Sequence, residues 1–318
     1  MRTPVCEMLG IEQPIVQAPV GSAAVPRLAA AVSEAGALGM VALTWTADVT
    51  GVVGQTAALT ERPFGGNLVL EWDQHRRLDQ ALGAGLRIVS LTWGDPAPYV
   101  DQIHQAGALV LHTVGSAAQA RRAADAGVDV IVAQGWEAGG HVWGGIATLP
   151  LVPAVVDAVA PVPVIAAGGI GDARGVAAVL ALGAQAAWLG TRFLLAEEAP
   201  VHEDYRRRLI AAAETDAQWY ADLFEAGWPD APHRAIRNTT AEMWEAAGRP
   251  GPGRRPGEGE EIAQAQGRPI VRYSSALALE GTTGDIEALS LWAGQSVALA
   301  RQLQPASEIV AELTARLT

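Results

Sequence analysis

Short apolar runs alternate with amphipathic segments along the first two thirds of the chain. The runs are rich in Val, Ile, Leu and Ala, as expected for parallel strands buried on both faces. They predict eight strands, at residues 14–19, 39–43, 65–70, 87–92, 108–113, 128–134, 163–168 and 185–190. The segments between them predict helices, several of which stop at a glycine, the residue favoured at a helix C-terminus.

Eight strand–helix units before residue 200 predict an α/β fold, the (β/α)8 TIM barrel, whose catalytic groups lie on loops after the carboxyl ends of the strands. An open doubly wound sheet is the alternative. After residue 200 the rhythm gives way to helical patterns at 205–214 and 217–227 and then to a Pro/Gly-rich, charged stretch at 246–261. Such a stretch cannot build a hydrophobic core, so we predict that it is a mobile connector.

We therefore expect two units: a barrel made of residues 1–198 and 269–318, and a small, mainly helical inserted subdomain at 199–268. Helical pattern returns at 285–303 and 307–317, and we expect these two helices to pack back on the barrel.

Composition narrows the class of protein. Half of the 318 residues are apolar and the formal net charge is −12, which argues against a nucleic-acid or anionic-membrane surface. A single cysteine and the lack of zinc-like Cys/His spacing predict no metal site and a reducing compartment. With no secretion signal and no run of 18 apolar residues, we expect a soluble cytoplasmic protein.

Two glycine-containing loops, 166–175 and 189–193, follow the seventh and eighth predicted strands, where TIM barrels commonly bind phosphate. Gly168 and Gly169 let backbone N–H groups approach an anion, and Asp172 is placed to cap the next helix. Gly190 and Thr191 add an amide and a hydroxyl. Either loop alone could simply turn the chain, but two at adjacent barrel positions favour a phosphate site. Neither carries the lysine of a nucleotide P-loop.

The stretch QGWEAGGH, residues 134–141, follows the sixth strand and places His141 at the mouth of the barrel. Histidine titrates near neutral pH, which suits a general base or acid. His112 ends the fifth strand and can equally be a core residue. The other four histidines fall on helical patterns or in the subdomain and do not look catalytic: His75, His104, His202 and His233.

Asn67 and Gln134 are amides at strand positions where apolar residues would pack better. Either a neighbouring loop or a heterocycle with donors and acceptors on its edge would satisfy them. Pro19 and Gly21 after the first strand give a stiff edge against which a flat ring could lie. A phosphate site, a flat polar-edged ring site and a nearby histidine together describe flavin mononucleotide (FMN).

Several segments, in order, resemble the nitronate monooxygenase family. They are PIVQAPVG, AAAVSEAGALGMVALTW, FGGNL, QGWEAGGH, TLPLVPAVVDAV, PVIAAGGIGDARG and GAQAAWLGTRF. The resemblance covers most of residues 11–200, and YSSALALEGTTGDIEALSLWAGQS extends it to 273–296. These motifs are specific for the superfamily and much less so for the substrate.

The resemblance implies a TIM barrel with a helical insertion, non-covalent FMN, and oxidation of alkyl nitronates by O2 to a carbonyl compound and nitrite. It implies that His141 is the catalytic base, which takes a proton from neutral nitroalkanes where these are substrates. Ala18, Pro19 and Val20 would contact the flavin ring through their backbone. The other implied cofactor contacts are Asn67, Gln134, Gly139, Gly140, Gly168, Gly169, Gly190 and Thr191.

Two positions depart from the pattern. Many family members carry Lys or Gln where this chain has Thr113, which offers the flavin only a hydroxyl, and Met where it has Val20. Trp136 and Trp143, on either side of the EAGGH motif, add bulk near the expected substrate pocket.

Two other functions remain open. One is an FMN-dependent NAD(P)H reductase of the enoyl-acyl-carrier-protein or quinone type, since the enoyl reductase shares the EAGGH and AAGGI motifs. The other is a flavin-binding protein without catalysis, against which the intact His141 argues. As partners we expect a small-molecule substrate and O2, no nucleic acid and no membrane, with a homodimer left as an open alternative to a monomer.

Overall fold

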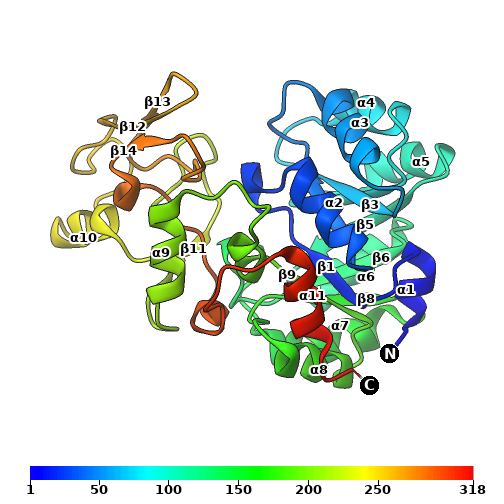
Figure 1. The fold of residues 1–318 in the computed structure, drawn as a ribbon. Helices are drawn as coiled ribbons and strands as arrows, with labels where there is room; N and C mark the ends of the chain where they lie inside the picture. The colour runs from blue at the N-terminus through cyan, green and yellow to red at the C-terminus, as the bar shows by residue number, and fades with distance from the viewer. Residues whose placement is uncertain (318) are drawn as a thin grey trace.

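The computed structural model describes residues 1–317 and has the predicted parallel barrel (Figure 1). Its eight strands each overlap one predicted run: β1 (Ile15–Gln17), β2 (Gly39–Ala42), β3 (Phe64–Val69), β4 (Ile88–Thr92), β5 (Leu109–Val114), β6 (Val130–Gln134), β8 (Val164–Ala167) and β9 (Ala186–Leu189). The hydrogen-bonded order is β1-β9-β8-β6-β5-β4-β3-β2. A parallel bridge between Val16 and Leu38 joins β1 to β2, so the sheet is nearly closed and the open-sheet alternative is wrong.

Side chains fill the barrel interior toward the amino ends of the strands and leave it open at the carboxyl ends. Alternate strand residues point inward. The inward residues away from the carboxyl ends are large and apolar, including Met40, Leu111 and Ile165, all fully buried. At the carboxyl ends of the strands most inward positions become small or polar, and Trp188 of β9 is the large exception. The small or polar residues are Ala18, Ala42, Asn67, Thr92, Thr113, Gln134 and Ala167.

Helices cover the outside of the barrel, as the amphipathic segments predict. They are α2 (Pro26–Glu34), α3 (Val49–Leu59), α4 (His75–Gly83), α5 (Ala97–Gln105), α6 (Ala117–Asp125), α7 (Thr148–Val159), α8 (Ala173–Ala181) and α11 (Ala306–Thr314). The short helix α1 (Pro4–Leu9) instead packs its buried residues against interior side chains of the barrel such as Met40 and Leu111. Asp172 caps α8, since its carboxylate accepts the N–H groups of Arg174 at 2.9 Å and Gly175 at 3.2 Å. Within residues 1–317, no helix is long and apolar enough to cross a membrane.

The segment after β9 is not mainly helical, which corrects the prediction. It contains two helices, α9 (Glu203–Ala211) and α10 (Thr239–Ala246), and five short strands: β10 (Ala217–Tyr220), β11 (His233–Ile236), β12 (Glu261–Ala265), β13 (Arg268–Val271) and β14 (Thr283–Gly284). β13 and β14 both pair with β12, so this small sheet continues past residue 268. Figure 1 shows α10, β12, β13 and β14 grouped in a lobe beside the barrel.

Two predicted helices are wrong for a common reason. The pattern at 217–227 has helical spacing, yet residues 217–220 form β10 because they pair antiparallel with β11. The pattern at 285–303 gives only two 3-10 turns, η3 (Ile286–Ala288) and η4 (Gln295–Leu299). In both cases contacts with distant parts of the chain override the local pattern.

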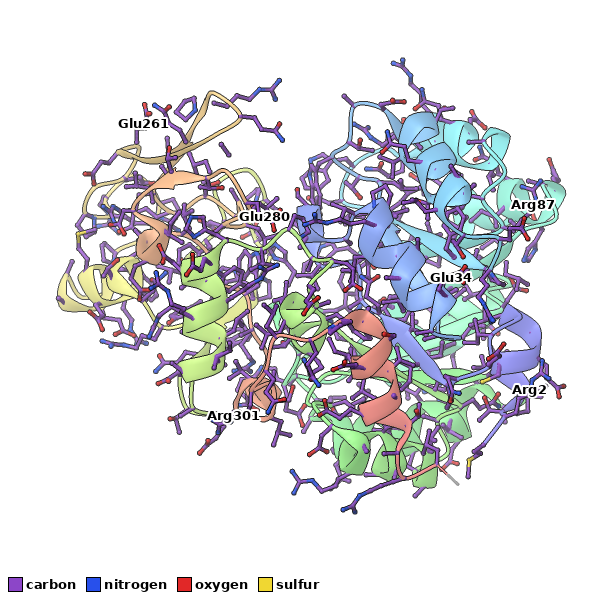
Figure 2. All side chains as sticks on the ribbon, viewed as in Figure 1. Arg2, Glu34, Arg87, Glu261, Glu280 and Arg301 are labelled. Carbon is purple, nitrogen blue, oxygen red and sulfur yellow. The ribbon has the colours of Figure 1, made fainter. Side chains whose placement is uncertain are left out.

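The Pro/Gly-rich stretch predicted as a mobile connector packs around a buried arginine instead. Arg255 is almost fully buried and pairs with the Glu225 carboxylate at 2.6 Å. The lobe also meets the barrel through Glu280, which Figure 2 shows at the junction and which pairs with Arg27 of α2 at 3.0 Å. Both members of that second pair are exposed, so it contributes little stability.

Candidate active site

A cavity of about 370 Å³ opens at the carboxyl ends of the barrel strands. Its volume lies in the range of small-molecule sites. Every residue predicted for the site lines it: Ala18, Pro19, Val20, Asn67, Thr113, Gln134, Gly139, Gly140, His141, Gly168, Gly169, Gly190 and Thr191. His112 does not. It is buried within β5, as expected for a core residue.

At one end of the cavity the backbone offers free donors. In the described part of the chain, no hydrogen bond uses the N–H groups of Gly168, Gly169 or Gly190. Gly168 has φ +93°, and a Cβ there would lie 2.8 Å from the carbonyl oxygen of Gly135, so only glycine fits. Ser296 brings a hydroxyl to this end, 3.4 Å from the Ile170 carbonyl oxygen. Unpaired amides beside hydroxyls suit a phosphate group.

At the other end of the cavity lie the amide side chains of Asn67 and Gln134. Unlike the glycine N–H groups, each is hydrogen-bonded to another protein group. The Asn67 carbonyl oxygen accepts a hydrogen bond from the Thr92 hydroxyl at 2.8 Å. Gln134 donates to the carbonyl oxygen of His141 at 3.1 Å and accepts from the N–H of Trp143 at 2.9 Å. Of the two partners left open for Gln134, the neighbouring loop is thus the one observed. The glutamine holds the His141 segment in place and still lines the cavity.

His141 lies in the short strand β7 (Gly140–His141), which pairs antiparallel with β11. Its Nδ1 is 3.2 Å from the carbonyl oxygen of Ala231. A carbonyl only accepts, so Nδ1 carries the proton and Nε2 keeps a lone pair. Burial, and next the neighbouring His233, lower the pKa of His141 to about 3, although the bond to Ala231 opposes this shift. At neutral pH His141 is therefore an uncharged acceptor.

His233 was not expected to take part, but it supports His141. It is fully buried, and its Nδ1 donates to the same Ala231 oxygen at 3.0 Å while its Nε2 accepts the Phe224 N–H at 3.0 Å. Both ring nitrogens are thus paired, and burial lowers the pKa of His233 to about 4. The two imidazole centroids are 5.7 Å apart. No local pattern could show this pairing, because β11 lies far from β7 in the chain.

The two tryptophans of the EAGGH region have different places. Trp143 packs edge-on against Trp93, with ring centroids 4.6 Å apart, behind the cavity. Trp136 does not line the cavity and lies under the guanidinium of Arg234, 4.3 Å from its ring centroid. Four tryptophans that the pattern did not single out line the cavity: Trp45, Trp188, Trp228 and Trp292.

The cavity is electrically neutral. No Asp, Glu or Arg is among its lining residues in the described part of the chain, and the sequence contains no lysine. Among the described residues that line it, His141 is the only titratable side chain, and it is uncharged at neutral pH. An anionic group in this cavity would therefore have to be bound by neutral N–H and O–H donors.

Comparisons with a family model, with curated proteins and with solved structures each find similar proteins. The nitronate monooxygenase family model matches residues 2–316. A Mycobacterium tuberculosis protein named "(3aS,4S,5R,7aS)-5-hydroxy-7a-methyl-1-oxo-octahydro-1H-indene-4-carboxyl-CoA dehydrogenase" is 37% identical over 78% of this chain and 70% of its own. A nitronate monooxygenase of Paraburkholderia phytofirmans is 33% identical over 98% and 93% of the two chains. The structure of FabK from Thermotoga maritima superposes with a TM-score of 0.82 at 30% identity, over 99% and 96%.

Proposed function

Because the chain belongs to the nitronate monooxygenase family, a family of flavin-dependent oxidoreductases, we propose that it binds FMN and oxidises alkyl nitronates with O2 to a carbonyl compound and nitrite. One observation carries the proposal. The uncharged His141, with its Nε2 lone pair free, lines the same cavity as a set of unpaired backbone donors suited to a phosphate.

The cavity residues fit FMN. The amides of Gly168, Gly169 and Gly190 would bind its phosphate, and Asn67 and Thr113 would bond polar atoms of its ring. When bound, FMN supplies the electron acceptor and the reaction with O2. The protein's own part is to hold the substrate beside that ring and to present the Nε2 of His141 to the carbon that bears the nitrogen.

The pKa of His141 bears on which protonation state of the substrate is used. A general base works best when its pKa lies near the working pH, and a pKa of about 3 makes His141 a weak acceptor at neutral pH. A neutral nitroalkane must lose a proton from carbon, whereas a nitronate has already lost it. We therefore expect kcat/KM for a nitronate to exceed that for the parent nitroalkane at least about a hundredfold, on the usual scale of general-base effects.

Oxygen uptake and nitrite release test the proposal. Flavin-loaded protein should turn over ethyl or propyl nitronate and form nitrite, and nitroethane should react far more slowly. His141→Ala should keep the yellow colour and lose about 10²-fold or more of the activity with nitroethane, because the proton acceptor is gone. If no nitronate is oxidised by flavin-replete protein, the substrate assignment is wrong.

A second function keeps FMN and changes the reaction. The likeness to FabK lends weight to an NAD(P)H-dependent reductase, and the M. tuberculosis relative is named as a dehydrogenase of an acyl-CoA. Mixing the protein anaerobically with each reductant separates the cases. Rapid bleaching of the flavin by NADH or NADPH supports the reductase, and bleaching by nitronate alone supports the oxidase.

A further inference from the structure

We propose that the part of the cavity next to His141 selects substrates with a bulky, uncharged hydrocarbon group, and disfavours those with a second charge. This inference rests on the proposed function and names its substrate class. It comes from a group of side chains that we call the tryptophan wall: Trp45, Trp72, Trp93, Trp143, Trp228 and Trp292.

Five members of the tryptophan wall are in continuous ring contact, and the sixth, Trp292, lies next to them through the His141 ring. Trp45, Trp72 and Trp228 form a triangle, with ring centroids 6.0, 6.0 and 5.4 Å apart. Trp93 continues it, 5.2 Å from Trp228. The loops after three consecutive barrel strands, β2, β3 and β4, supply Trp45, Trp72 and Trp93, so the rings gather at one side of the barrel mouth.

The tryptophan wall contacts His141, the proposed base. The His141 ring lies 3.9 Å from Trp228 and 5.4 Å from Trp292, centroid to centroid. Both tryptophans line the cavity, as does Trp45. A substrate whose reacting carbon meets the Nε2 of His141 must therefore place its remaining atoms against indole faces. Large flat apolar surfaces bind hydrocarbon well and gain little from a two-carbon chain.

The rim of the cavity is also apolar and aromatic. Trp45 is 53% exposed and Trp72 is 37% exposed, although tryptophan is usually well covered in folded proteins. Their neighbour Trp93 has φ +66°, a left-handed conformation that is rare for a bulky residue. A contiguous exposed apolar area at the mouth of a cavity is typical of a binding surface for an apolar ligand.

The tryptophan wall also disfavours a second charge on the substrate. A nitronate carries one negative charge, at the end that must approach His141. A substrate with a carboxylate would place a second charge against the tryptophan wall, where no arginine or lysine is available among the described residues that line the cavity. Burying an unpaired charge is strongly unfavourable. A hydrocarbon group in that place has no such penalty.

The test compares three nitronates on the flavin-loaded protein: cyclohexyl nitronate, ethyl nitronate and the nitronate of 3-nitropropionate. We expect kcat/KM for the cyclohexyl compound to exceed that for the ethyl compound about tenfold or more, since single methylenes are worth that much in fitted apolar pockets. The carboxylate-bearing compound should be the poorest of the three. Equal values for the cyclohexyl and ethyl compounds, or a preference for the carboxylate, would overturn the inference while leaving nitronate oxidation in place.

A pair of variants connects the preference to the wall. Trp45→Ala should reduce the cyclohexyl-to-ethyl ratio of kcat/KM about tenfold, because it removes one face of the wall. Trp219→Ala is the matched control, since Trp219 is also exposed, at 40%, but does not line the cavity. It should leave the ratio unchanged. Equal effects of the two variants would contradict the assignment.

Binding without turnover separates this inference from the proposed function. Cyclohexanone and acetone can be titrated into the flavin-loaded protein while its absorbance is followed. Cyclohexanone should bind at least about tenfold more tightly, because it buries three more carbon atoms than acetone, even if no nitronate is oxidised. Equal dissociation constants would show that the wall does not select for hydrocarbon bulk.

Discussion

Two histidines share one acceptor at the centre of the site. The carbonyl oxygen of Ala231 accepts from the Nδ1 of both His141 and His233, at 3.2 and 3.0 Å. This single oxygen thus fixes the protonated nitrogen of the candidate base. It belongs to the segment inserted after β9, and the base belongs to the barrel. The chemistry of His141 therefore depends on how that segment packs against β7.

His233→Leu should alter His141 without touching the cavity. The Phe224 N–H loses its acceptor, which should lower the free energy of unfolding by about 1–3 kcal/mol in a denaturant titration. Removing the neighbouring imidazole should also raise the pKa of His141, because His233 helps to depress it. The activity that needs neutral His141 should then be lost at a higher pH on acidification.

The measurement is the pH profile of kcat/KM for nitroethane. His75→Leu is the matched control, since this exposed histidine stacks on Tyr99 away from the cavity. If the acid limb of the His233→Leu profile coincides with that of the wild type, His233 is a packing residue only.

Among the elements, the barrel and the helix predicted at 205–214, which is α9, were predictable, and the rest of the inserted segment was not. A barrel strand such as β4 is a short, mainly apolar run buried on both faces, and this pattern can be recognised in the local sequence. β10 is different. Its residues carry a helical spacing, and only their pairing with β11 makes them a strand. Local periodicity holds no information about such a distant partner.

The residues of the candidate site also fall into a group that could be predicted from the sequence and a group that could not. Residues at strand ends, such as Asn67 and Gly168, could be placed because barrel topology brings those ends together. Trp228, Trp292 and Ser296 could not, since no strand count places them at the barrel mouth. The contact of His233 with the His141 segment could not be predicted either, because β11 is distant from β7 in the chain. Trp45 does follow a strand, but a lone tryptophan after a strand does not distinguish a cavity wall from a core contact.

A buried arginine connects the predicted phosphate loop to the last helix. Arg192, next to Thr191, is 2% exposed and bonds the Glu312 carboxylate of α11 at 2.9 Å. Arg192→Met should lower the free energy of unfolding by about 2 kcal/mol, since it removes the hydrogen bonds that the buried guanidinium donates to Gln302 and Glu312. It should also weaken FMN binding several-fold, because the Thr191 loop loses this support.

Denaturant titration and flavin-fluorescence titration measure the two effects. Arg174→Ala removes an exposed arginine paired with Asp172, and such surface pairs are worth about 0–1 kcal/mol. If Arg192→Met behaves like Arg174→Ala in both measurements, α11 does not support the phosphate loop.

At the scale of the whole molecule, three buried histidines predict how stability depends on pH. Burial lowers the pKa of His112 and His233 to about 4 and that of His141 to about 3, below the 6.5 of an unfolded chain. Between these values the unfolded state binds more protons, so stability is full above about pH 6.5 and is lost as the pH falls toward 4. Protonation of each of His112 and His233 should lower the free energy of unfolding by on the order of 3 kcal/mol.

Unfolding midpoints in a denaturant series from neutral to mildly acidic pH check this expectation. His112→Asn is a suitable comparison, because it removes one titrating group away from the cavity. Its stability should fall less steeply with acidification than that of the wild type. If the stability of the variant and that of the wild type fall equally with pH, carboxylates rather than His112 cause the loss of stability in acid.

The absence of charge from the cavity lining has a consequence for how a flavin would respond to ionic strength. Anion sites built on Lys or Arg lose affinity as salt is added, because salt screens the attraction. Here the local donors are neutral and the molecule as a whole carries a formal charge of −12, which repels a phosphate. Added salt would screen that repulsion, so FMN should be retained better in concentrated buffers and lost on dialysis into dilute ones.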